Sequence, residues 1–163
     1  MTSGELSETM LYLVRHGEAK PKDEDPERGL TLLGADAVAR MVAWAAGAGI
    51  RVDEIQHSSK LRAQQTAEIF ARYLSNAPIP QVVSGLAPND DVEPIAQQLV
   101  GTSRPIMLVG HLPFLESLTS LLVADDADAS VASLEAGALL ALAKCESGWN
   151  AVCLMQPKLL PVS

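Results

Sequence analysis

Leu11-Tyr12-Leu13-Val14-Arg15-His16-Gly17-Glu18 is the stretch that decides the fold of this 163-residue chain. Four apolar residues run directly into an arginine, a histidine and a glycine, a pattern typical of a buried strand that ends abruptly. Open α/β sheets build their sites outside the carboxyl ends of their strands. The stretch therefore predicts a site that begins with Arg15 and His16.

The rest of the chain alternates predicted strands with predicted helices. Apolar runs and periodic apolar faces predict strands at 52–57, 81–84 and 105–110, and helices at 31–48, 59–74, 92–100 and 113–123. Two late strands, 138–143 and 151–155, are joined by a turn at 146–148 and predict a hairpin, so at least one of them runs antiparallel. The alternation predicts an α/β layered fold with a mostly parallel sheet.

Length and composition predict one domain spanning 1–163, with a short polar tail at 1–9. The chain is 48% hydrophobic, which is enough to bury a core, and no repeat or linker interrupts it. No apolar run is long enough to cross a bilayer, and the tail lacks the features of a signal peptide. Cys145 and Cys153 lack zinc-ligand spacing and are expected to be reduced, buried thiols. Together these features predict a cytoplasmic protein.

The balance of charge limits the partners. Twenty acidic residues against twelve basic ones give a formal net charge of −8. Such a surface repels nucleic acid and anionic membranes, so neither is expected as a partner. A local cluster of arginines on this acidic protein would need an anionic ligand to explain it.

Residues from three separate segments are expected to converge on the opening stretch. The first and fourth predicted strands deliver His16 and His111 to the same edge of a parallel sheet. Ser58 is expected to cap the helix at 59–74, which puts Arg62 in its first turn. A cation there opposes the helix dipole by about 0.3–1 kcal/mol when exposed, unless an anion lies between the cation and the helix end.

Arg15, Arg62, His16 and His111 would together form a positive, donor-rich pocket that suits a phosphoryl group. The planar fork of arginine matches two phosphoryl oxygens and keeps its charge. A neutral imidazole can attack phosphorus, and the resulting phosphohistidine later yields to water. Two arginines and a second histidine could hold the charge that gathers on the equatorial oxygens. This chemistry requires no metal, and no cofactor is expected.

Four sequence blocks resemble the histidine phosphatase superfamily, which includes the phosphoglycerate mutases. The blocks are Leu13 to Glu18 with its R-H-G signature, Leu30-Thr31 with Gly34, Ser58 with Leu61-Arg62-Ala63 and Gln65-Thr66, and Gly110-His111-Leu112-Pro113. Their order and compact spacing, over roughly 11–122, are most similar to the short SixA-type protein phosphohistidine phosphatases. The resemblance implies a phosphoglycerate mutase-like three-layer α/β/α sandwich, with a mostly parallel central sheet and an antiparallel edge strand.

The resemblance also implies a role for each matching residue. His16 matches the nucleophile that accepts the phosphoryl group, and Arg15 and Arg62 match two phosphate-binding arginines. His111 matches the second histidine of the pocket. Gly17, which follows the nucleophile in the signature, is expected to line the substrate site. The expected ligand is a phosphate or phosphoryl group.

The proton donor is where this chain departs from the mutases and acid phosphatases, which carry a carboxylic acid in the site. Leu112 follows His111 here, and the candidate donors Glu18, Asp90 and Asp91 stand at no position that can be matched securely to the family; we prefer to interpret all three as loop charges. A weak acid suits the imidazole leaving group of phosphohistidine better than an alkoxide. This favours a phosphohistidine-bearing protein as substrate, in bacterial phosphorelay signal transduction, and the absence of long insertions implies an open site.

Other interpretations remain open at this stage. A small-molecule phosphomonoesterase would be favoured by Asp90 or Asp91 near the nucleophile, whereas a non-catalytic phosphoryl-binding module would not need His16. A zinc site built from His16, His57 and His111 lacks paired spacing and would place two arginines beside a cation. We expect His57 to be structural. Arg28 occupies a position where SixA-type sequences often carry arginine, which makes it a further candidate for phosphate contact.

Overall fold

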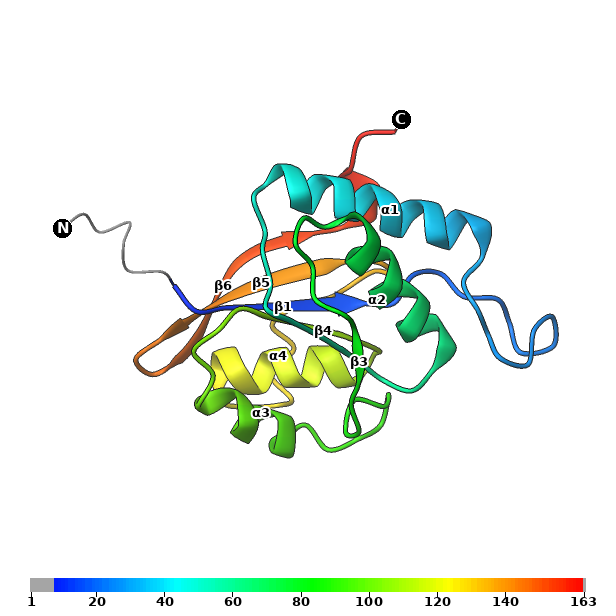
Figure 1. The fold of residues 1–163 in the computed structure, drawn as a ribbon. Helices are drawn as coiled ribbons and strands as arrows, with labels where there is room; N and C mark the ends of the chain where they lie inside the picture. The colour runs from blue at the N-terminus through cyan, green and yellow to red at the C-terminus, as the bar shows by residue number, and fades with distance from the viewer. Residues whose placement is uncertain (1–7, 163) are drawn as a thin grey trace.

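The computed structural model describes residues 8–162. In it, the apolar part of the opening stretch lies in β1 (Met10–Arg15), a central strand of a six-stranded sheet. The sheet order is β3-β2-β4-β1-β5-β6. The other strands are β2 (Glu54–His57), β3 (Gln81–Val82), β4 (Ile106–Gly110), β5 (Leu139–Cys145) and β6 (Gly148–Met155), as Figure 1 shows. Strands β1 to β4 are parallel, whereas β5 pairs antiparallel with both β1 and β6. The mostly parallel sheet and the late hairpin are therefore confirmed.

Helices cover both faces of this sheet. On one face lie α1 (Leu32–Gly47) and α2 (Leu61–Tyr73), and on the other lie α3 (Glu93–Val100) and α4 (Phe114–Ala124) (Figure 1). A short 3-10 helix, η2 (Pro157–Leu159), follows β6 and contacts α1. Each helix begins and ends within two residues of the predicted bounds, and the three layers confirm the α/β/α sandwich.

The central strand is apolar throughout because both of its faces are buried. Tyr12 and Val14 pack into the cluster beneath α1 and α2, while Leu11 and Leu13 pack into the cluster beneath α3 and α4. Successive side chains of a strand point to opposite faces, so a strand covered on both sides reads as a continuous apolar run. That burial leaves the end of β1 as the first place where polar side chains can emerge.

The start of α1 is held tightly against the chain that follows β1. The Thr31 hydroxyl accepts a hydrogen bond from the Gly34 N–H at 2.8 Å and donates to the Glu18 carboxylate at 2.7 Å. A Cβ atom on Gly34 would lie 2.2 Å from the Glu18 carbonyl oxygen, so only glycine allows this approach. The close contact fixes the backbone just after His16.

The start of α2 corrects one prediction. Ser58 does not cap this helix: the N-cap residue is Lys60, without a side-chain capping bond, and Arg62 is the second helical residue. The Ser58 hydroxyl lies 3.4 Å from the Lys60 backbone nitrogen but only 2.5 Å from His111 Nε2. The hydroxyl that the sequence predicts to cap α2 is therefore hydrogen-bonded mainly to His111, which follows the neighbouring strand β4.

Some features outside the sheet also bear on the predictions. Residues 1–7 of the expected tail at 1–9 lie outside the described residues. Cys145, the last residue of β5, and Cys153, in the edge strand β6, are free but only half-buried, so the expected full burial is wrong. Among residues 8–162, every helix is too short or too polar to span a membrane.

Candidate active site

The ends of three adjacent strands bring the candidate site together. In the sheet order, β2, β4 and β1 are neighbours, and they are followed by Ser58, His111 and His16 respectively. The backbone N–H of His16 donates to the Gly110 carbonyl at 3.0 Å, which extends the parallel pairing past the strand ends. The two imidazole rings lie 5.0 Å apart between centroids, tilted by 57°. The structure thus places both predicted histidines at the carboxyl edge of the sheet.

The ring of His16 is oriented by the backbone of the next residue. Its Nδ1 donates to the Gly17 carbonyl at 2.7 Å, because a carbonyl can only accept, and this leaves Nε2 with the lone pair. The pKa of His16 is lowered to about 4, mainly by burial; the Gly17 hydrogen bond opposes this shift, and the positive charges of Arg62, Arg15 and Arg28 add to it. The ring is therefore a neutral imidazole near pH 7, the form that can act as a nucleophile.

His111 is almost completely buried, with 1% of its surface exposed. Its Nε2 is hydrogen-bonded to the Ser58 hydroxyl, and its Nδ1 is buried without a partner. Burial is the main cause that lowers the pKa of His111 to about 3, followed by the charges of His16, Arg62, Lys60 and Arg28. This second ring is also neutral near pH 7.

Arg15 and Arg62 each have a buried N–H donor without a hydrogen-bond acceptor among the described residues. Arg15 Nη1 donates to the Leu134 carbonyl at 2.8 Å, but Arg15 Nε and Arg62 Nε are buried without partners. Burial, and then the charge of Arg28, lower the pKa of the Arg62 guanidinium. With His111 Nδ1, these two nitrogens are all the buried, unpaired side-chain nitrogen and oxygen atoms found among residues 8–162. Buried polar groups are nearly always paired, so these three nitrogens, all on residues next to or within the histidine pair, are candidate contacts for a polar ligand.

Two residues of α2 form hydrogen bonds that connect three of the four sequence blocks in space. The Thr66 hydroxyl accepts from the Gly17 N–H at 3.0 Å, and the Gln65 side-chain oxygen accepts from the Leu30 N–H at 2.7 Å. A Cβ atom on Gly17 would lie 2.8 Å from Val38 Cγ2, so this position has no room for a larger residue. The Gly17 N–H is thus committed to Thr66, and the residue borders the site through its backbone.

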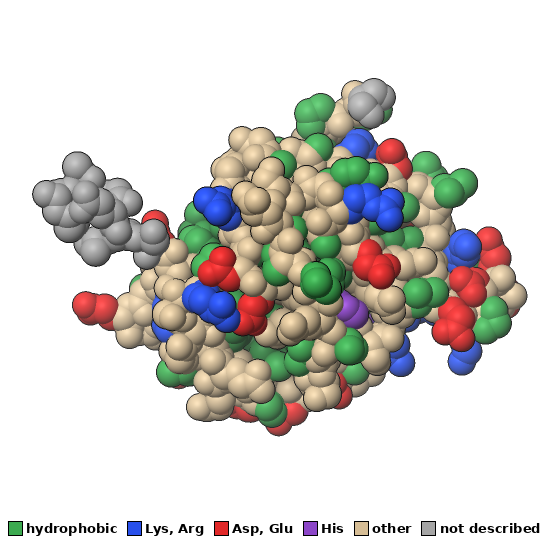
Figure 2. All heavy atoms as spheres, viewed as in Figure 1, with side chains coloured by type: hydrophobic (Ala, Val, Ile, Leu, Met, Phe, Trp, Pro, Cys, Tyr) green, Lys and Arg blue, Asp and Glu red, His purple; other side chains and the backbone are tan. Residues whose placement is uncertain are grey.

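The loop at 20–29 brings another cation towards the site. Arg28 adopts a left-handed backbone conformation, with φ of 52°, and its Nε donates to the Lys20 carbonyl at 3.0 Å. Its charge contributes to the lowered pKa values of His16, His111 and Arg62, which places it within electrostatic reach of all three. Basic and acidic side chains gather on this loop at the right of Figure 2. Local spacing alone gave no sign of this convergence.

The three candidate proton donors lie in different surroundings. Glu18 accepts from Thr31 at the start of α1, and Asp91 accepts from the Glu93 N–H at the start of α3, at 3.0 Å. Asp90 accepts from the Ala87 N–H at 2.9 Å and lines a cavity of about 270 Å³ that Ser58 also lines. Asp90 thus shares a cavity with Ser58, which contacts a pocket histidine.

His57 is not part of the histidine pair. Its Nδ1 donates to the Ser58 carbonyl at 2.8 Å, and its ring is buried, as expected for a structural residue. Within the described part of the chain, no three His, Cys, Asp or Glu side chains form a group that could hold a metal ion. The zinc arrangement of His16, His57 and His111 is therefore not assembled.

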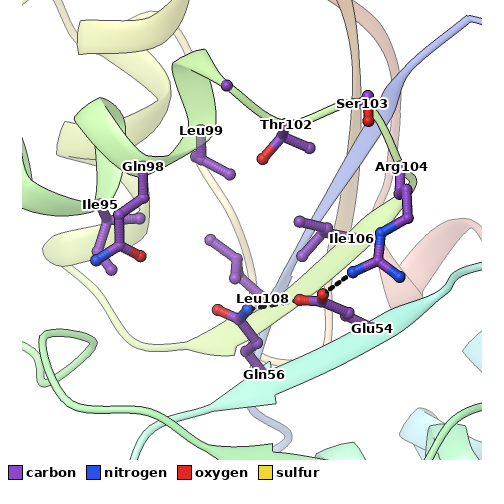
Figure 3. Close-up of a pocket in the computed structure, with 11 residues that line it drawn as sticks. Glu54, Gln56, Ile95, Gln98, Leu99, Thr102, Ser103, Arg104, Ile106 and Leu108 are labelled. Carbon is purple, nitrogen blue, oxygen red and sulfur yellow. Dashed lines mark hydrogen bonds and ion pairs between the residues drawn. The ribbon is translucent and has the colours of Figure 1, made fainter.

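A second cavity, of about 280 Å³, lies at the opposite edge of the sheet, where β2 and β4 begin (Figure 3). Glu54 lies between Arg104, with which it forms an ion pair, and Gln56, which donates to it at 2.9 Å. These polar groups satisfy one another. This cavity is separate from the histidine pair and contributes nothing to its chemistry.

Both pocket histidines are expected to stay neutral down to unusually low pH. Their pKa values of about 4 for His16 and about 3 for His111 lie below the value of about 6.5 for free histidine. The unfolded chain takes up these protons near pH 6.5, whereas the folded protein does so only near pH 4 and pH 3. The stability that the two neutral rings contribute is therefore complete above about pH 6.5 and is lost as the pH falls to about 4 for His16 and about 3 for His111. NMR titration of the ring resonances checks this, and a midpoint near 6.5 for either ring would contradict it.

Comparison with known proteins gives a consistent assignment. The family model of the histidine phosphatase superfamily (branch 1) matches residues 11–86. The phosphohistidine phosphatase SixA of Escherichia coli is 27% identical over 115 residues, which cover 68% of this chain and 71% of that protein. An uncharacterized protein of Picosynechococcus is 35% identical over 112 residues, or 64% of this chain and 67% of that protein.

Solved structures share the fold over nearly the whole chain. A protein histidine phosphatase SixA complexed with tungstate matches with a TM-score of 0.81 and 24% identity, covering 92% of this chain and 98% of that one. A putative SixA of Agrobacterium tumefaciens matches with a TM-score of 0.75 and 25% identity, covering 91% and 98%. The fold is thus the one seen in phosphoglycerate mutase-like histidine phosphatase structures. The chain belongs to the histidine phosphatase superfamily and is a phosphatase of that superfamily, which confirms the predicted resemblance.

Proposed function

We propose that this protein removes the phosphoryl group from a phosphohistidine on a partner protein, through a covalent phosphohistidine on His16. The observation that carries the proposal is the group of three buried, unpaired nitrogens: Arg15 Nε, Arg62 Nε and His111 Nδ1. Buried donors without a protein partner suit a bound oxyanion, and arginine suits phosphate in particular. The tungstate held by the SixA structure of the same fold supports an oxyanion site.

The first chemical step uses the lone pair of His16 Nε2. This nitrogen attacks phosphorus while the bond to the imidazole nitrogen of the substrate breaks, so the phosphoryl group passes from one imidazole to another. The hydrogen bond from Nδ1 to the Gly17 carbonyl keeps the ring oriented and stabilises the positive charge that Nε2 develops. Arg15 and Arg62 neutralise charge on the equatorial oxygens.

The second step returns the enzyme to its starting state. Water attacks phosphorus, the bond to His16 Nε2 breaks, and inorganic phosphate leaves with the oxygen of water. Both bonds that break in the cycle join phosphorus to an imidazole nitrogen. His16 keeps its proton on Nδ1 and therefore leaves as neutral imidazole, and the substrate ring does the same when its own unphosphorylated nitrogen carries a proton. A strong carboxylic acid in the pocket is therefore unnecessary, in keeping with the local hydrogen bonds of Glu18 and Asp91.

A small-molecule phosphomonoesterase is the second candidate, because Asp90 lines a cavity next to Ser58. An alkoxide leaving group needs a proton, and in this second candidate function we propose Asp90 as its source. A binding module without turnover is less well supported, since the neutral His16 with its free Nε2 is not needed for binding alone. For the main candidate we propose a cytoplasmic setting and a part in phosphorelay signalling, on a surface whose net charge of −8 disfavours nucleic acid and membranes.

The decisive experiment compares three substrates under the same conditions: a phosphohistidine-bearing protein, free phosphohistidine and an alkyl phosphomonoester. We expect kcat/KM to be highest for the phosphohistidine protein. Equal rates on free and protein-bound phosphohistidine would contradict the protein substrate but retain the chemistry. A preference for the alkyl ester would favour the phosphomonoesterase, and binding of tungstate without turnover of any of the three would contradict both catalytic candidates and favour the binding module.

A further inference from the structure

Ser58 and His111 form a buried pair at the ends of two adjacent strands. The Ser58 hydroxyl and His111 Nε2 lie 2.5 Å apart, and the two residues are 2% and 1% exposed. The backbone N–H of Ser58 donates to the Val109 carbonyl at 3.3 Å, so the parallel pairing of β2 with β4 continues to the serine. The sheet itself therefore fixes this contact.

The direction of this hydrogen bond follows from the neighbours of the hydroxyl. The backbone N–H of Lys60 is directed at Ser58 Oγ from 3.4 Å and favours the use of that oxygen as an acceptor. The Lys60 N–H can only donate, so among residues 8–162 His111 Nε2 is the one protein acceptor found for the single hydroxyl proton. A neutral imidazole has one N–H, and His111 is neutral because burial lowers its pKa to about 3. Its proton must accordingly be on Nδ1.

The location of that proton decides what His111 can do for the reaction. Nδ1 is buried without a protein partner, as are Arg15 Nε and Arg62 Nε. With a proton, Nδ1 is a third donor for phosphoryl oxygens. Without one, its lone pair would repel the same oxygens. The hydrogen bond made by one ring nitrogen sets the state of the other.

We propose that Ser58 is a positioning residue: its hydroxyl donates to His111 Nε2 and holds this histidine in the tautomer whose Nδ1–H binds the phosphoryl group. The donation to phosphoryl rests on the proposed function, whereas the tautomer can be measured without any substrate. The family blocks include Ser58 only by position, and the contact supplies a physical reason for a serine there.

Two measurements test this assignment. Nitrogen-15 NMR of the free enzyme is expected to show His111 protonated on Nδ1, and tungstate is expected to shift the Nδ1–H resonance downfield. In Ser58→Ala, the Nδ1–H form should lose population and kcat should fall about 10- to 100-fold, by analogy with the loss found when the partner that orients a metal-ligating histidine is removed. KM should change much less, because the donor acts mainly on the transition state.

Two further variants serve as controls. Ser58→Thr keeps a hydroxyl and should retain both the tautomer and most of kcat. Ser59→Ala removes an exposed hydroxyl from the next residue and should change neither. Protonation of His111 on Nε2 in the wild type would overturn the assignment, as would an unchanged tautomer or wild-type kcat in folded Ser58→Ala. The NMR result stands even if no phosphohistidine substrate is turned over, so the two proposals can fail separately.

Discussion

His16→Ala is expected to abolish turnover while the protein keeps its fold and its affinity for oxyanions. Removing a covalent nucleophile lowers kcat by up to about 10⁶-fold, and neither His111 nor the arginines can replace Nε2 at phosphorus. The His16 side chain makes one hydrogen bond, to the adjacent Gly17 carbonyl, so the fold loses little. Steady-state assays with the phosphohistidine protein measure the rate, and thermal unfolding measures the fold.

The intermediate gives an independent readout for the same substitution. Wild-type protein, quenched during turnover, should carry a phosphoryl group that is stable in base and labile in acid, and His16→Ala should carry none. Tungstate should still bind to the variant, because Arg15, Arg62 and His111 keep their donors. Turnover by His16→Ala at the wild-type rate would refute the covalent mechanism.

Arg62→Ala is expected to lower kcat by about 10²- to 10³-fold, the loss found when one preorganised donor to a developing oxyanion is removed. Arg62 Nε is buried without a partner, and the guanidinium is close enough to lower the pKa values of His16 and His111. The substitution should therefore also raise both pKa values, which the NMR titration can detect.

Arg62→Lys separates charge from geometry at the same position. Lysine keeps the positive charge but lacks the planar fork, so a substantial loss of kcat is expected to remain. Arg72→Ala is the matched control, because Arg72 lies in the last turn of the same helix and is exposed. Wild-type activity in Arg62→Ala, or an equal loss in Arg72→Ala, would contradict the proposed role.

The helices and strands could be predicted from local sequence because each has its own pattern of apolar or capping residues. β1 is covered on both faces and so appears as a continuous apolar run, and Thr31 accepts from Gly34 as a helix cap should. The positions of His16 and His111 followed from one rule, that parallel strands end at a common edge. The contact between their rings is a direct result of the pairing of β1 with β4.

The remaining features of the site depend on contacts between distant residues, which local patterns do not encode. Serine commonly caps helices, but the Ser58 hydroxyl is hydrogen-bonded to His111, 53 residues further along the chain. Arg15 is held by the Leu134 carbonyl, a contact 119 residues away that involves no side chain of Leu134. Glu18 follows the nucleophile closely in sequence, yet its carboxylate accepts from Thr31.

The two outer strands of the sheet have a consequence for how the protein behaves at high concentration. Edge strands offer unpaired N–H and C=O groups on which another chain can add a strand, and long flat edges are templates for aggregation. On one side β3 has only two residues, and on the other the pairing of β5 with β6 shifts register between Ala141 and Leu142. Such a bulge twists an edge away from a flat template. Neither edge therefore favours growth of the sheet from one molecule into the next.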